Sequence, residues 1–232
     1  MAKFYALICL FLLSCLPSNS LAKNYYMEIL SYAKGNEGEY IAINKLWTSP
    51  YKLKLEHNNL IFILSKDSKE LIYAIKSKNS YIKFQGTTLF ALELILPLMI
   101  PEKNLQVESI QPFYEDIKTI NNYLCFKTIV NFKNKIKEKP SSITVWATRK
   151  LNIEYSILNI INSVIEYPFS KIINIANQIN GFPILIQGDI MFQNENYFVK
   201  YELLKFQQIE IKDKVFELPP DYKLIEYNFS YK

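Results

Sequence analysis

The chain has 232 residues, of which 50% are hydrophobic and 15% aromatic, so it holds enough apolar side chain for a substantial core. This composition excludes an intrinsically disordered protein. The formal net charge of +5 comes almost entirely from lysine, because Arg149 is the single arginine. Lysine lacks the planar fork with which arginine contacts phosphates and bases, so we expect no nucleic-acid partner.

Residues 1–22 have the layout of a secretory signal: one basic residue, an apolar run, and small residues at the end. The apolar run is shorter than the roughly 20 residues that a membrane-spanning helix needs. Two processing outcomes stay open. Cleavage after Ala22 leaves a mature chain from residue 23, whereas a lipoprotein signal of residues 1–14 leaves an acylated Cys15 at the new terminus. Both outcomes predict an exported protein that is periplasmic or anchored in the envelope.

Residues 23–232 are predicted to form a single domain, because neither a repeat nor a low-complexity linker interrupts them. Strands are expected where apolar and polar residues alternate between polar turns: 40–47, 51–56, 60–64, 71–76, 81–84, 123–132, 142–149, 182–192, 197–211 and 215–219. The close spacing of the first five strands indicates an antiparallel meander with one wet and one dry face.

Three segments have helical character. Residues 87–96 are apolar on nearly every side, so a helix there must be buried against the sheet, since it is too short to span a bilayer. Residues 152–166 and 169–179 place apolar side chains at helical spacing. The expected fold class is therefore α+β, with a mostly antiparallel sheet and helices packed on one side of it.

Residues that carry chemistry are sparse. His57 is the only histidine, so a Ser-His-Asp set or a paired-histidine metal site cannot be built, and we predict it to be a solvated turn residue. Asp189 and Glu202 fall in predicted strands without pairing by spacing, and an enzyme would need them to converge. Cys125, the one thiol beyond the signal, is expected to be a small buried side chain. We therefore expect no catalytic residue, metal or cofactor.

Three patterns together resemble the LolA/LolB-type lipoprotein-carrier fold and, more narrowly, a related family of exported proteins known only as a domain of unknown function. They are "INKLWTSPYKLKLE" (43–56), "ITVWATRKLNI" (143–153), and "NGFPILIQG" (180–188) joined to "FELPPDYKLIE" (216–226). The resemblance implies an incomplete antiparallel β-barrel, a curved sheet with helices packed on its concave face, where acyl chains bind.

The carriers have an arginine in the second strand pair that controls the lid, and the matching stretch here has Lys52 and Lys54. Apolar lining serves a core and a ligand cavity equally well. The candidate lining residues are Trp47, Tyr51, Leu53, Leu55, Phe62, Tyr73, Phe90, Leu94 and Trp146.

The predicted function is that of a non-enzymatic cell-envelope protein that binds a lipid or a lipidated peptide in an apolar concavity. The alternative is a structural or interaction lipoprotein whose own side chains fill the core. The lysine-rich residues 133–141 make an anionic membrane surface a possible contact, and a protein partner stays unknown. At the C-terminus, Phe216 and Leu218 are expected to face inward on a closing edge strand that ends at Pro219 and Pro220.

Overall fold

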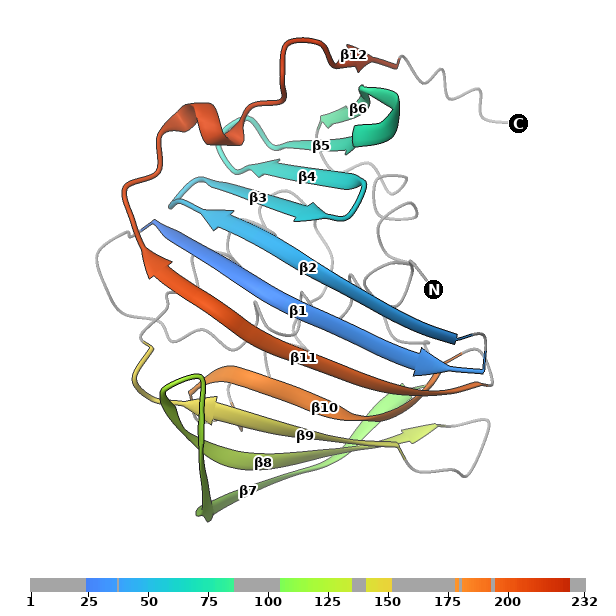
Figure 1. The fold of residues 1–232 in the computed structure, drawn as a ribbon, viewed down its shortest axis with the longest axis vertical. Helices are drawn as coiled ribbons and strands as arrows, with labels where there is room; N and C mark the ends of the chain where they lie inside the picture. The colour runs from blue at the N-terminus through green and yellow to red at the C-terminus, as the bar shows by residue number, and fades with distance from the viewer. Residues whose placement is uncertain are drawn as a thin grey trace.

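The computed structural model describes residues 24–36, 38–85, 105–134, 141–151, 178–179, 181–192 and 195–225. Its strands form one open sheet in the order β12-β6-β5-β4-β3-β2-β1-β11-β10-β9-β8-β7 (Figure 1). Neighbouring strands are antiparallel except for the parallel pair of β12 and β6. The strands β6 and β7 follow each other in the chain but lie in opposite halves of the sheet.

The strands are β1 (Tyr25–Gly35), β2 (Gly38–Thr48), β3 (Lys52–His57), β4 (Leu60–Ser65), β5 (Glu70–Ile75), β6 (Ser80–Gln85), β7 (Leu105–Ile120), β8 (Tyr123–Asn134), β9 (Ser141–Thr148), β10 (Phe182–Phe192), β11 (Glu195–Gln208) and β12 (Lys223–Leu224). Two 3-10 turns, η1 (Lys76–Lys78) and η2 (Asp213–Phe216), complete the described elements.

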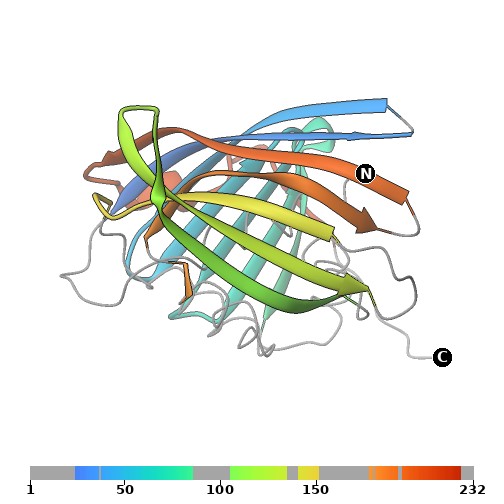
Figure 2. The same cartoon turned by 90° about the horizontal axis from the view of Figure 1, so that it is seen from below.

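The sheet is curved (Figure 2), and its two faces differ because successive side chains point to opposite sides of a strand. Met27, Leu46 and Leu55 pair across β1, β2 and β3, so they share the inner, concave face, where all three are buried. Ile41 and Ile43 occupy alternate positions of β2 on the outer face and are 63% and 50% exposed. The core therefore lies on the inner side of the first three strands.

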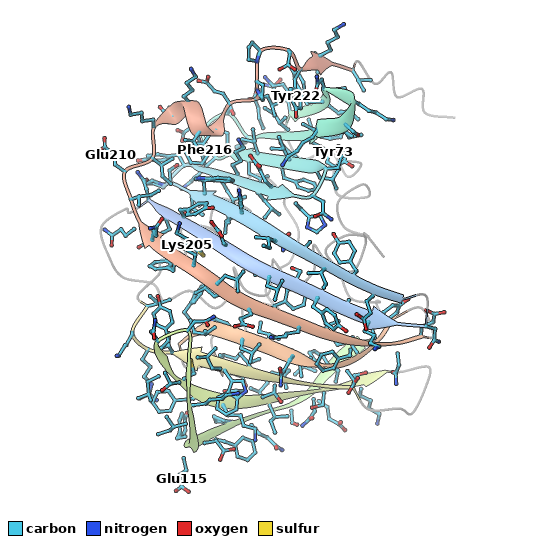
Figure 3. All side chains as sticks on the ribbon, in the orientation of Figure 1. Tyr73, Glu115, Lys205, Glu210, Phe216 and Tyr222 are labelled. Carbon is cyan, nitrogen blue, oxygen red and sulfur yellow. The ribbon has the colours of Figure 1, made fainter. Side chains whose placement is uncertain are left out.

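Beyond β11 the chain forms a C-terminal strap, residues 209–225, that crosses the outer face of β3 to β6 (Figure 3). Phe216 in η2 is 5% exposed and packs with Ile61, Ile63 and Ala74, the outward-facing residues of β4 and β5. The strap thus gives this half of the sheet a second hydrophobic cluster on its outer face, which we call the outer cluster.

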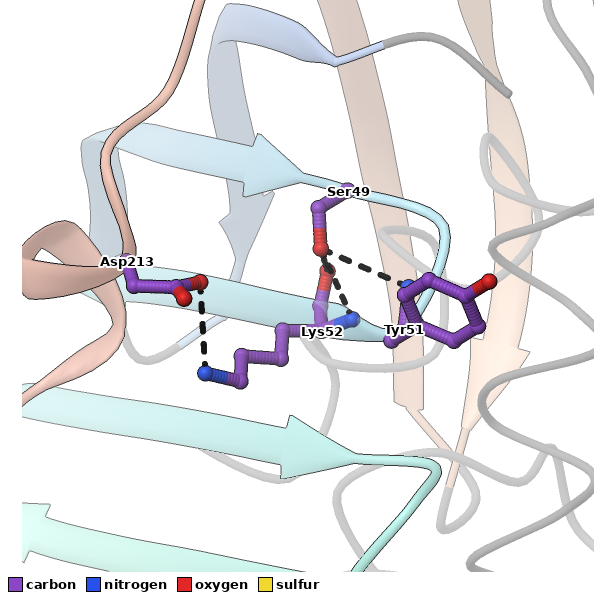
Figure 4. Close-up of polar contacts among 4 residues, drawn as sticks. All are labelled: Ser49, Tyr51, Lys52 and Asp213. Carbon is purple, nitrogen blue, oxygen red and sulfur yellow. Dashed lines mark hydrogen bonds and ion pairs between the residues drawn. The ribbon is translucent and has the colours of Figure 1, made fainter. Parts of the chain in front are cut away.

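Polar contacts fix both ends of the strap. Ile209 N–H donates to the Asn24 carbonyl at 3.3 Å, and Ile225 N–H donates to the Tyr81 carbonyl at 2.8 Å. Between them, Lys52 Nζ lies 3.3 Å from Asp213 Oδ1 (Figure 4). The Ser49 hydroxyl accepts the Lys52 N–H at 2.9 Å and so holds the turn that precedes β3.

The β7–β8 hairpin bends back over the sheet. Its tip, Asn121 and Asn122, has positive φ at both residues, as a tight two-residue hairpin turn requires. The pairing register of β7 jumps from Phe113 to Ile117, so extra residues bulge out and the strand turns sharply. The Asn121 side chain then reaches β11, where its amide donates to the Leu203 carbonyl at 2.8 Å.

The expected α+β class is wrong for the part of the chain that the structure describes, which is nearly all β with no helix packed on the concave face. The class depended on the helices expected at 87–96, 152–166 and 169–179, and these ranges lie outside the described residues apart from 178–179. The described sheet is also larger than expected, because β1 and β7 were not predicted as strands.

The other strand predictions agree with the structure except at the C-terminus. Nine predicted strands match β2 to β6 and β8 to β11 within a few residues at each end. The strand expected at 215–219 is wrong, because Phe216 belongs to the 3-10 turn η2 and Leu218 packs in the outer cluster. The edge strand is instead β12, and Pro219 accepts a turn hydrogen bond from Tyr222 N–H at 3.1 Å.

Candidate functional site: the inner apolar face

The inner apolar face is built by strands whose alternate residues are large and apolar. Strand pairing places Leu55 opposite Phe62, and Phe62 opposite Tyr73, so these side chains form a row across β3, β4 and β5. The rings of Phe62 and Tyr73 are 5.2 Å apart between centroids. Each large side chain buried in such a row contributes about 1.5–3 kcal/mol to stability. The buried apolar members of this face in β1 to β6 are Tyr25, Met27, Ile29, Ala33, Leu46, Leu53, Leu55, Phe62, Leu64, Leu71 and Phe84.

Four of the predicted lining residues meet on this face. Leu53, Leu55 and Phe62 are 2%, 8% and 7% exposed, and Tyr73 is half-buried against them. They come from three neighbouring strands of the predicted meander, whose strict alternation puts them on one side.

Three other predicted residues lie elsewhere. Trp47 is on the outer face, where its ring lies 5.2 Å from the ring of Tyr26 and packs against the outer cluster. Trp146 lies in β9, in the other half of the sheet, where it pairs with Lys127 and is partly buried against the main hydrophobic cluster; Lys118 Nζ lies 5.9 Å from its ring centroid. Tyr51 precedes β3 and is 53% exposed. The structure therefore does not bring these rings to the inner row.

The remaining candidates fall outside the described residues. Phe90 and Leu94 belong to the range 86–104, and Cys15 belongs to residues 1–23, which also contain the expected signal. Their roles stay predictions.

Lys52 and Lys54, which stand where carriers have an arginine, point away from the inner row. Lys52 holds the strap through Asp213, and Lys54 Nζ lies 3.2 Å from Glu56 and 5.5 Å from the Trp47 ring centroid. Burial opposes ionisation of Glu56, but hydrogen bonds from Lys76 and Lys54 outweigh it and hold the pKa of this carboxyl below its usual range. Lys52 and Lys54 thus make their contacts on the outer face of the sheet and not with the inner row.

A set of polar side chains interrupts the inner apolar face. We call it the His57 network; its members are Ser31, Asn44, His57, Tyr40 and Asn58. Asn44 pairs directly with His57 across β2 and β3, and Ser31 and Asn44 are completely buried. The prediction of a solvated turn histidine is therefore wrong, because His57 ends β3 and its ring takes part in the network.

The hydrogen bonds of the network have one consistent direction. The Asn44 amide nitrogen donates to the Ile29 carbonyl at 3.2 Å and to the Ser31 hydroxyl at 2.5 Å, so its oxygen faces His57. Since that oxygen only accepts, His57 Nδ1 carries the proton. In neutral histidine Nε2 is then an acceptor, and the Tyr40 hydroxyl donates to it at 2.8 Å. Asn58 donates in turn to the Tyr40 oxygen.

The His57 network makes stability depend on pH. Burial, with Lys76 adding to it, lowers the pKa of His57 below its ordinary value of 6.5. The unfolded chain therefore takes up the proton first, and the free energy of unfolding falls as pH decreases below 6.5 through the folded-state pKa. We expect a slope of at most about 1.4 kcal/mol per pH unit, since one proton is involved.

Urea unfolding between pH 7 and pH 5 measures this slope, and His57→Gln is expected to flatten it because the chain has no other histidine. Carboxyl groups whose pKa is lowered by folding, such as Glu202, change the free energy of unfolding only below this pH range, because their pKa in the unfolded chain is near 4.5. An unchanged slope in the variant would contradict the neutral assignment of His57.

Asp189 and Glu202, the two carboxylates considered as a catalytic pair, do not lie next to each other. Asp189 pairs with Phe198, whereas Glu202 pairs with Leu185, four residues further along the same pair of strands. Glu202 is occupied by Lys200 at 2.7 Å and by the Asn121 amide at 3.0 Å.

Cys125 is buried, as expected, and burial raises the pKa of its thiol to about 11, so it is a poor nucleophile in the folded state. Within the described ranges, acidic, cysteine and histidine side chains do not gather in threes as a metal ion would require. Across the same ranges, no helix is both long and apolar enough to cross a membrane.

Comparison with known proteins identifies structural likenesses only. Neither a family model nor a curated protein matches the chain. Among solved structures, PNGF-II has 15% identity and a TM-score of 0.38; the match covers 84% of this chain and 29% of PNGF-II. A DUF1329 family protein from Desulfovibrio piger has 6% identity and a TM-score of 0.36, with 92% and 98% of the two chains covered.

A LolA superfamily protein from Nitrosomonas europaea has 8% identity and a TM-score of 0.36, and the match covers 90% of this chain and 96% of that protein. The structural neighbours thus include a LolA superfamily protein and a DUF1329 family protein.

Proposed function

We propose that this protein is a non-enzymatic, exported cell-envelope protein that holds a lipid or a lipidated peptide against the inner apolar face. The observation that supports the proposal most is the row of Leu55, Phe62 and Tyr73 on the concave side of one open, curved sheet. A concave apolar surface with a few polar groups is the usual form of a site for an apolar ligand.

A second candidate is a structural or interaction lipoprotein that carries no ligand. The low exposure of Leu53 and Phe62 favours it, because side chains that are already 2% and 7% exposed have little surface left for a ligand to cover. The two candidates differ in what the purified protein contains, so one measurement separates them.

Native mass spectrometry of protein purified gently from an envelope fraction provides that measurement. We expect a mass excess equal to one acyl lipid, and a lower melting temperature after delipidation, because loss of a bound ligand removes its stabilisation. Equal mass and equal stability of the native and delipidated samples would contradict the proposal and support the second candidate.

A pair of variants locates the ligand. Tyr73→Gln changes a half-buried side chain of the inner row and is expected to reduce the bound fraction, whereas Ile43→Gln changes an outer residue that is 50% exposed and is expected to leave it unchanged. An equal effect of both variants would place the lipid elsewhere. The intact mass of the mature N-terminus, measured on the same sample, decides between Cys15 and residue 23.

A further inference from the structure

The β7–β8 hairpin is apolar on both of its faces beyond the bulge. On one face Ile120 and Cys125 are 8% and 0% exposed and belong to the main hydrophobic cluster. On the opposite face Ile117 pairs with Phe126, and Leu124 lies two residues before Phe126 in β8, on the same side. Ile117 and Leu124 are 52% and 43% exposed. An exposed row of large apolar side chains is typical of an interaction surface.

Tyr114 and Arg149 extend this exposed face. The guanidinium carbon of Arg149 lies 4.9 Å from the ring centroid of Phe126 and 5.8 Å from that of Tyr114, which is 52% exposed. Two cation–π contacts therefore hold the planar fork of Arg149 at the surface.

We call Tyr114, Ile117, Leu124, Phe126 and Arg149 the hairpin patch. Aromatic rings and an arginine are enriched at the centre of protein–protein interfaces, where they supply much of the binding energy. The composition of the hairpin patch therefore favours a protein as its partner.

Two opposite charges at the hairpin patch form no ion pair with another described residue. They are Arg149 and Glu115, the residue after Tyr114 in β7. Asp116, by contrast, is paired with Lys127 at 2.9 Å. Glu115 is exposed and points away from the sheet (Figure 3). The same surface thus offers one cation and one anion to a partner.

A second copy of this chain fits this pair of charges. When two identical surfaces meet across a two-fold axis, each contact between two different residues occurs twice, with the roles of the copies exchanged. A two-fold axis through the hairpin patch therefore pairs Arg149 of each copy with Glu115 of the other. An anionic membrane surface fits less well, because it attracts Arg149 but repels Glu115 and Asp116.

We propose that the hairpin patch is the contact surface of a symmetric homodimer, with its apolar side chains at the centre and two reciprocal ion pairs between Arg149 and Glu115. This inference goes beyond the proposed function and does not depend on a bound lipid. The patch has fewer residues than the roughly 20–30 a side of a standard interface. We therefore expect a dimer with a dissociation constant on the order of 10 µM.

Sedimentation equilibrium of the purified mature protein between about 1 and 500 µM tests the dimer. Arg149→Glu and Glu115→Arg are each expected to raise the dissociation constant at least about tenfold, because each change places like charges opposite one another at two points. An equimolar mixture of the two variants is expected to dimerise as the wild type does, because their heterodimer again pairs opposite charges.

Ile117→Gln tests the apolar part of the patch and is expected to raise the dissociation constant about tenfold. Ile41→Gln is its matched control, because Ile41 in β2 is 63% exposed but lies outside the hairpin. Lys66→Glu, at an exposed position in the turn between β4 and β5, repeats the charge change of Arg149→Glu. Both controls are expected to keep the dissociation constant of the wild type.

Three results would overturn the inference. One is a protein that stays monomeric up to the highest concentration. The second is a dimer that none of Arg149→Glu, Glu115→Arg and Ile117→Gln weakens. The third is loss of dimerisation in both charge variants without recovery in their mixture, which would exclude the reciprocal ion pairs.

Melting curves show whether Arg149→Glu still folds after the loss of its two ring contacts. If it does not, Glu115→Arg and Ile117→Gln carry the test, because both positions are exposed. Each of these outcomes leaves the proposed function standing, since lipid binding is measured separately.

Discussion

Replacing Gly181 by alanine is expected to lower the free energy of unfolding by about 3–5 kcal/mol, a large fraction of the stability of a typical domain. Gly181 has φ +127°, and a Cβ there would lie 2.5 Å from the Thr148 carbonyl oxygen and 2.8 Å from its carbon. Both atoms belong to the backbone of β9. The steric clash with the new Cβ can therefore be relieved only if β9 and β10 move apart at the end where they pair.

Gly38→Ala is the control for this experiment. Gly38 has nearly the same backbone conformation, with φ +121°, but a Cβ there meets no described atom within 4 Å. It is expected to cost only the conformational penalty of about 1–2 kcal/mol. Urea unfolding of both variants gives the difference, and equal losses would show that the contact with Thr148 has no energetic consequence.

Phe216→Ala is expected to detach the strap and to cost about 3–5 kcal/mol, the usual range for a buried phenylalanine. Phe216 is the buried residue of η2, and its removal leaves Ile61, Ile63 and Ala74 without their central partner. Because the strap ends with the pairing of β12, limited proteolysis of residues 209–225 is expected to accelerate as well.

Leu224→Ala tests whether the effect comes from burial rather than from any change in the strap. Leu224 is 50% exposed in β12, so its truncation is expected to change stability by no more than about 0.5 kcal/mol. Comparable losses in the two variants would mean that Phe216 does not anchor the strap.

The alternation of apolar and polar residues predicted most of the strands, because this pattern is a local property of the sequence. It failed at β1, where Ser31 and Ala33 occupy inward positions and weaken the apolar pattern, and at β7, where Pro112 and the bulge before Ile117 break the period of two. The strand expected at 215–219 failed for the opposite reason, since its apolar residues serve a 3-10 turn and the outer cluster.

The candidate site was predictable in part. Leu55, Phe62 and Tyr73 follow from alternation within one meander, but composition alone does not say which face a tryptophan takes, and Trp47 falls on the outer one. The His57 network was missed because its bonds join three strands. The sequence did contain a signal, because Asn44 is an amide at an inward position of β2 between the apolar residues Ala42 and Leu46.

The position of β11 has a consequence for how the chain folds. Every neighbouring pair within β1 to β6, and within β7 to β11, joins strands that are consecutive in the chain, whereas β1 meets β11 through the pairing of Tyr25 with Gln208. We expect each half to assemble before the two halves join, because its strands pair mostly with their neighbours in the chain, and the long-range pairing of β1 with β11 to follow. We expect the pairing of β1 with β11 to limit the folding rate, and the edge of β1 to be open to aggregation until that pairing forms.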